Sequence, residues 1–109
     1  MTHELPKPIA DYIGAANAGD TESLGLCFRD DAVVRDEGKS IEGLAAIKQW
    51  LAETKRKYQH VIEPLASVES DGRTVVTNRL VGNFPGSPIE LEFIFLLEGG
   101  KIASLEILS

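Results

Sequence analysis

The chain has 109 residues, of which 43% are hydrophobic and 26% charged, a composition typical of one globular domain with a single buried core. Its 11 basic and 17 acidic residues give a net charge of −6, which repels phosphate backbones and argues against nucleic acid as a partner. No apolar run approaches the roughly 18 residues of a membrane helix, and the start MTHELPKPIADYI has no apolar block of a secretory signal. We therefore expect a cytoplasmic protein with no membrane partner.

The first half of the chain predicts three helices. The first begins near Pro6, ends at Gly19, and carries an apolar stripe made of Ile9, Tyr12, Ile13 and Ala16. A short second helix, capped by Asp20 or Thr21, buries a face made of Leu24, Cys27 and Phe28. The third helix opens at Gly43, and its inner face consists of Leu44, Ile47, Trp50, Leu51, Thr54 and Tyr58. Cys27, the single cysteine, is expected to be a small buried hydrophobe.

Between the second and third helices the sequence predicts one short strand. Residues 32–35 (AVVR) are rich in β-branched side chains. The preceding RDD is interpreted as a break in the chain, with Asp30 and Asp31 capping a turn, and the following DEGKS as a loop.

The second half of the chain predicts four long strands, over residues 60–70, 73–84, 89–98 and 101–108. The pairs Asp71-Gly72 and Gly99-Gly100 mark tight hairpin turns, and Pro64 implies either a bulge or an edge position. Helices followed by a meander of strands predict an α+β fold, with the helices gathered on one face of a sheet. No linker interrupts the pattern, so residues 1–109 are interpreted as one domain.

Two segments resemble a known family. The segment YIGAANAGDTESLGLCFRDDAVVRDEGKSIEGLAAIKQWL resembles the opening half of the SnoaL-like proteins, in the nuclear transport factor 2-like superfamily, and LEGGKIASLEIL resembles their last hairpin. The resemblance implies a cone: a strongly curved, largely antiparallel sheet with helices packed on it, enclosing a pocket for a small apolar ligand. It also implies a homodimer that pairs through the outer face of the sheet. Because this scaffold hosts both enzymes and non-catalytic binders, it does not define an activity by itself.

The same segments are similar to ketosteroid isomerase, and this similarity assigns candidate roles. In that family an aspartate after the first strand removes a proton beside a carbonyl, while a tyrosine and a second, protonated aspartate donate hydrogen bonds to the oxygen. The resemblance places Asp36 at the position of the base, Tyr12 at that of the tyrosine, and Phe93 at that of the second aspartate. Glu92 is one residue away, so it faces the other side of the strand. The resemblance therefore leaves three alternatives: a divergent isomerase or cyclase that needs no metal or organic cofactor, a non-catalytic binder of a small apolar ligand, or a dimeric interaction module.

Each candidate residue also has a plainer interpretation. Asp36 is either a proton-transfer group in a cavity or a loop acid; in an apolar cavity its pKa should lie above the usual value of about 3.9. Tyr12 is either a hydrogen-bond donor or a core residue. Glu106 is expected on an exposed strand face rather than in a pocket, and His60 is either a proton carrier or, more simply, a surface residue. Four aromatic residues are candidates to contact a ligand or to form the core: Phe28, Trp50, Phe93 and Phe95.

Overall fold

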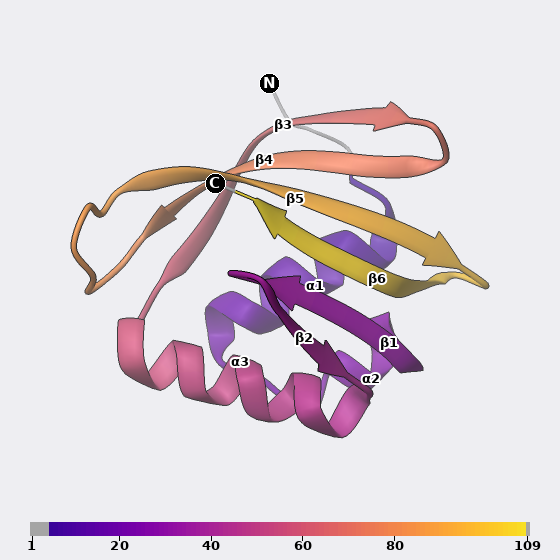
Figure 1. Ribbon diagram of the computed structural model, residues 1–109, viewed down its shortest axis with the longest axis horizontal. Helices are drawn as coiled ribbons and strands as arrows, with labels where there is room; N and C mark the ends of the chain where they lie inside the picture. Colours follow the sequence, from indigo (N-terminus) through magenta and orange to yellow (C-terminus); the bar gives the residue numbers. More distant parts are fainter. Residues whose placement is uncertain (1–4, 109) are drawn as a thin grey trace.

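The computed structural model describes residues 5–108, which form three helices and six strands (Figure 1). The helices are α1 (Lys7–Ala18), α2 (Leu24–Cys27) and α3 (Leu44–Tyr58). The strands are β1 (Phe28–Asp36), β2 (Lys39–Glu42), β3 (Val61–Ser70), β4 (Arg73–Val81), β5 (Ile89–Glu98) and β6 (Lys101–Leu108). Within residues 5–108, no helix is long and apolar enough to cross a membrane.

All six strands belong to one mixed sheet, in the order β2-β1-β6-β5-β4-β3. Every neighbouring pair is antiparallel except β1 and β6, which run parallel. The sheet curves strongly, and the helices lie against its concave side, with α3 beside the β1–β2 hairpin (Figure 1). The predicted α+β cone, with helices on one face of a curved sheet, is confirmed.

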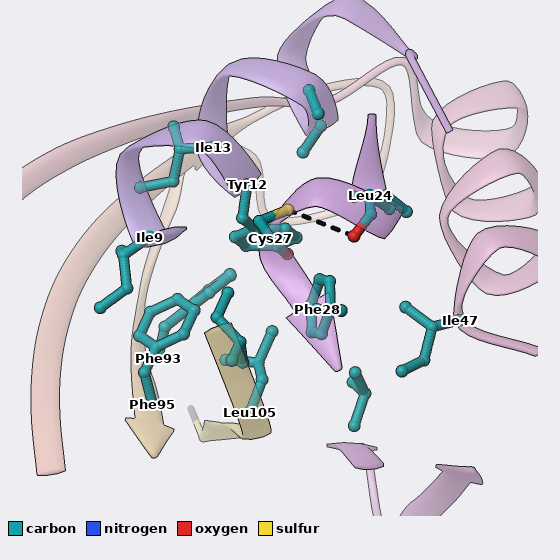
Figure 2. Close-up of a cluster of buried hydrophobic side chains, with 14 of the residues drawn as sticks. Ile9, Tyr12, Ile13, Leu24, Cys27, Phe28, Ile47, Phe93, Phe95 and Leu105 are labelled. Carbon is teal, nitrogen blue, oxygen red and sulfur yellow. Dashed lines mark hydrogen bonds between the residues drawn. The ribbon is translucent and has the colours of Figure 1, made fainter. Parts of the chain in front are cut away.

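The core lies between the inner face of the sheet and the helices. On β5, Phe93 and Phe95 are buried while Glu90 and Glu92 are exposed, as the alternation of the sequence predicts. The ring of Tyr12, on α1, packs among the aromatic side chains shown in Figure 2, with centroid distances of 5.5, 5.9 and 6.5 Å to Phe28, Phe95 and Phe93. The predicted stripe of α1 is buried in this core. From the predicted inner face of α3, Ile47 and Leu51 are buried there as well.

The region around β1 differs from the prediction. β1 spans nine residues instead of the expected four, and Asp30 and Asp31 lie within the strand rather than in a capping turn. The pairing of β1 with β6 shifts register between Phe28 and Val33, and this irregularity allows a polar run inside a strand to face water. Arg29 pairs there with Asp31 at 3.1 Å.

The expected loop DEGKS is instead mostly part of a hairpin. Only Glu37 and Gly38 form the turn, both with left-handed backbone (φ 55° and 76°), and β2 begins at Lys39. A two-residue turn with both φ values positive matches the twist of the strands that it joins. This hairpin holds Asp36 opposite Lys39 at the end of β1.

Other boundaries need smaller corrections. The residue before α2 is Ser23, not Asp20 or Thr21; Asp20 accepts a hydrogen bond from the Ser23 backbone N–H. β4 ends at Val81 rather than at residue 84. Pro64 lies beside a register shift and on an edge strand, so both predicted interpretations of this proline are confirmed.

Candidate functional site

A cavity of about 380 Å³ lies between the sheet and α3. Its size falls within the range of small-molecule sites. Apolar side chains from β3, β4, β5, β6 and the β4–β5 connection supply much of its wall: Ile62, Leu80, Phe84, Pro85, Ile89, Leu91, Phe93 and Ile107. Its polar groups include Tyr12, Asp36, Thr54 and His60.

Asp36, the last residue of β1, is half-buried at this cavity and accepts a hydrogen bond from the indole. The distance from Trp50 Nε1 to Asp36 Oδ2 is 3.3 Å. Burial raises the pKa of the Asp36 carboxyl, and the neighbouring charge of Glu37 raises it further; the Trp50 hydrogen bond and Lys39 act in the opposite direction. The direction is the one predicted for a carboxyl group in an apolar cavity.

Tyr12 lies on the same cavity and is almost completely buried. Burial raises the pKa of its phenol above the usual range, and the charge of Asp36 adds to the shift, followed by that of Cys27. The phenol is therefore neutral and holds its proton, so it can act as a hydrogen-bond donor. The phenol and the Asp36 carboxyl group line the same cavity.

The four aromatic candidates divide into two pairs. Trp50 and Phe93 line the cavity. Phe28 and Phe95 are fully buried in the core beneath α1 and do not line the cavity (Figure 2), which agrees with the alternative interpretation of both side chains as core residues. The alternation of buried and exposed residues along β5 correctly assigned Phe95 to the inner face of the sheet. At Phe95 that face is covered by Tyr12 of α1. The cavity lies further along the strand, beside Phe93 and Leu91.

His60 is a buried residue and not a surface residue. The residue is 8% exposed and lines the cavity. Gln59, which ends α3 with left-handed backbone (φ 48°), turns the chain so that His60 enters the inner face. The spacing of His60 and Ile62, two residues apart at the start of a strand, was the signal available in the sequence.

The structure shows on which face of the sheet two further polar residues lie. Asn78 is fully buried on the inner face of β4, and neither atom of its amide has a hydrogen-bond partner within residues 5–108. Glu106 pairs across the sheet with Ile94 and Arg35, on the outer face, as expected for an acid on a strand face that borders solvent.

A second hollow adjoins the cavity. A groove of about 540 Å³ runs between α3 and the β1–β2 hairpin. Five residues line both the groove and the cavity: Asp36, Glu37, Trp50, Thr54 and Tyr58. The Asp36 carboxyl group therefore stands where an apolar cavity meets a polar groove. Among the residues that the structure describes, no group of three or more His, Cys, Asp or Glu side chains could hold a metal ion.

Three helices packed on a strongly curved mixed sheet of six strands form the architecture of the ketosteroid isomerase-like folds. The chain belongs to the SnoaL-like domain family, whose model matches residues 9–105. A solved structure from Sinorhizobium meliloti, of a protein provisionally assigned as a polyketide cyclase, is 39% identical over 94% of both chains, with a TM-score of 0.90. No protein of curated function matches the sequence.

More distant solved structures share the fold. A Catenulispora acidiphila protein with a ketosteroid isomerase-like fold, in complex with trimethylamine, has a TM-score of 0.83 at 17% identity, covering 97% of this chain and 87% of its own. A SnoaL-like protein from Agrobacterium tumefaciens, provisionally assigned as an isomerase, has a TM-score of 0.77 at 15% identity, covering 94% and 95%. At these identities the likeness concerns the fold alone.

Proposed function

We propose that this protein binds a small, largely apolar carbonyl compound in its cavity and that Asp36 transfers a proton on it. The observation that carries the proposal is one half-buried carboxyl group with a raised pKa on the wall of an apolar cavity that also holds a neutral phenol. A base with a raised pKa is better matched to carbon acids near neutral pH. The assignment of the Sinorhizobium relative as a polyketide cyclase supports chemistry of this type.

The proposed proton transfer needs no cofactor. A C–H bond beside the carbonyl breaks, its proton goes to Asp36, and its electron pair forms an enolate whose oxygen accepts a hydrogen bond from the Tyr12 hydroxyl. Trp50 binds Oδ2 of the carboxylate, so Oδ1 is the oxygen available to take the proton. In a β,γ-unsaturated ketone, return of the proton from Asp36 to the γ-carbon isomerises the substrate. Attack of the enolate carbon on a second carbonyl of the ligand closes a ring, and the alkoxide that forms takes the proton from Asp36.

A non-catalytic binder is the second candidate, and Phe93 is the observation that favours it. The resemblance places a second acidic donor at this position, where the chain has a buried phenyl ring that cannot donate a hydrogen bond. Losing one preorganised donor costs an enzyme about 10²–10³ in rate. A protein with the cavity and only one donor is suited to binding even where turnover is slow.

The experiment that tests the proposal measures exchange of α-protons for deuterium. A bicyclic ketone such as 2-tetralone is incubated with the protein in D₂O and followed by proton NMR, while shifts in the protein spectrum report binding. We expect catalysed exchange that falls by about 10²–10⁴ in Asp36→Asn and by about 10²–10³ in Tyr12→Phe. Binding without exchange would support the binder; absence of binding by apolar ketones and phenols would overturn both functions.

We also propose that the protein is a homodimer joined through the outer face of its sheet. That face carries half-buried Ile94 and Leu96, together with exposed Val61, Val81 and Leu108, and apolar patches of this kind usually mark interfaces. Light scattering should give twice the chain mass, and Ile94→Glu should shift the species toward a monomer. A parent chain that stays monomeric at high micromolar concentration would overturn the dimer.

A further inference from the structure

The groove between α3 and the β1–β2 hairpin borders the cavity along two turns of α3. Trp50, Thr54 and Tyr58, spaced four residues apart on one face of the helix, line both hollows. At 1.5 Å per residue, this shared stripe is about 12 Å long. The two hollows therefore meet along a length of the helix. Asp36, at the end of β1, lies on the same border because it also lines both.

The two sides of this border differ in chemistry. On the cavity side, Leu91, Phe93 and Ile107 of the sheet are among the apolar residues that form the wall. On the groove side the wall consists largely of exposed polar and charged side chains: Lys39, Ser40, Glu42, Gln49, Glu53 and Lys57. Because polar groups lose free energy when they are buried without a partner, the cavity suits an apolar ring system and the groove suits a polar substituent.

The charges of the groove disfavour an anionic substituent. Its lining residues include four acidic side chains and two lysines: Asp36, Glu37, Glu42 and Glu53 against Lys39 and Lys57. The chain as a whole also carries a net charge of −6. A carboxylate or a phosphate in the groove would therefore be repelled. A hydroxyl group, in contrast, both donates and accepts hydrogen bonds, so it can use Ser40 and Gln49 as well as the charged groups.

Asp36 determines which part of the ligand lies at the border. The proposed proton transfer requires the carbonyl group and its neighbouring carbon to lie beside Asp36 and Tyr12. Asp36 is half-buried and lines both hollows, whereas Tyr12 is buried and lines only the cavity. A substituent next to the carbonyl group is therefore the part of the ligand with the shortest path to the groove.

We propose that the groove holds a polar substituent of the ligand, so that the substrates are apolar ring ketones that carry an uncharged, hydroxyl-bearing side chain next to the carbonyl group. The ring system occupies the cavity, the carbonyl group lies at Tyr12 and Asp36, and the side chain lies between α3 and the β1–β2 hairpin. This inference rests on the ligand-binding function proposed above and defines the class of compound.

Three phenols that share one ring system test this proposal. They are 2-naphthol, N-(2-hydroxyethyl)-3-hydroxy-2-naphthamide and 3-hydroxy-2-naphthoate, in which the phenol oxygen stands in for the enolate oxygen. By calorimetry, we expect the hydroxyethyl amide to bind the parent protein about three- to tenfold more tightly than 2-naphthol, the effect of about one hydrogen bond. The naphthoate should bind more weakly than the amide. NMR should show NOEs between the hydroxyethyl protons and the methyl group of Ala46, which lines the groove and not the cavity.

Matched variants change one hollow at a time. Ala46→Phe narrows the groove, so the affinity ratio of the amide to 2-naphthol should fall to about one while 2-naphthol binds as it does to the parent. Leu91→Ala alters the cavity wall, so it should weaken both probes equally and leave their ratio unchanged. The NOEs need no variant, so they test the position of the side chain even where a substitution impairs folding.

Two results would contradict the proposal in different ways. An affinity ratio near one in the parent, or NOEs from the hydroxyethyl group to cavity residues such as Phe84 and none to Ala46, would overturn the role of the groove and leave the proposed function standing. Failure of both 2-naphthol and 2-tetralone to bind the folded parent protein would overturn the proposed function, and the inference with it.

Discussion

Asn17, near the C-terminal end of α1, connects that helix to the edge strand β3. Its Oδ1 accepts a hydrogen bond from the Ile62 backbone N–H at 2.7 Å, and its Nδ2 donates to the Ile62 carbonyl oxygen at 3.0 Å. Because β3 is an edge strand, no further strand is available to these two backbone groups. The Asn17 amide thus makes the two hydrogen bonds to the Ile62 backbone that a neighbouring strand would otherwise make. Ile62 also lines the cavity.

The substitution Asn17→Ala removes both hydrogen bonds at once. Each contributes about 1 kcal/mol net, so the loss is about 2 kcal/mol; the better helix propensity of alanine returns about 0.5 kcal/mol. We expect the free energy of unfolding to fall by about 1.5 kcal/mol, or the melting temperature to fall by about 6 °C for a domain of this size. If water cannot reach the Ile62 groups, the loss will be larger.

Urea denaturation and amide hydrogen exchange test this prediction. The Ile62 amide should exchange faster in the variant, and Asn83→Ala is the matched control, since it makes the same change at an exposed residue outside the helices. Asn17→Asp keeps the acceptor but sets a negative charge against the Ile62 carbonyl, so it should destabilise the fold as well. A free energy of unfolding within about 0.5 kcal/mol of the parent in Asn17→Ala, with unchanged exchange at Ile62, would refute the reasoning.

Three further predictions concern the cavity. Gly82→Ala should destabilise the fold by about 1–3 kcal/mol. A Cβ atom at this position would lie 2.8 Å from the Tyr58 carbonyl oxygen and 3.0 Å from the Cα of His60. A melting temperature equal to that of the parent would contradict this prediction. Trp50→Phe removes the donor to Asp36, so carboxyl-detected NMR should show the Asp36 pKa moving further upward, and a downward move would count against the hydrogen bond. Because the pKa of Asp36 is raised in the folded state, the folded protein binds more protons than the unfolded protein between about pH 3.9 and the folded pKa. The protonated carboxyl group therefore favours the fold at low pH, and this contribution to stability is lost as the pH rises through that window. Asp36→Asn should therefore gain stability relative to the parent as pH rises through that window, and denaturation curves showing the opposite trend would refute the desolvation.

The sequence by itself determined those features that depend on neighbouring residues. The stripe on α1, the alternation on β5 and the turns at Asp71-Gly72 and Gly99-Gly100 follow from helical or strand periodicity and from local backbone preference. These signals predicted the α+β fold, and the resemblance added Asp36 and Tyr12 as candidates that the structure brings to one cavity.

The tertiary structure alone decided how deeply each residue lies and which element covers it. β1 extends to nine residues because it pairs with β6, about 70 positions away in the chain, and no local signal reports that pairing. Phe93 and Phe95 have the same periodicity, yet only Phe93 reaches the cavity, since α1 covers the sheet at Phe95. The shifted pKa values of Asp36 and His60 have the same origin: desolvation depends on the distant side chains that surround a group, and those are brought together only by the fold.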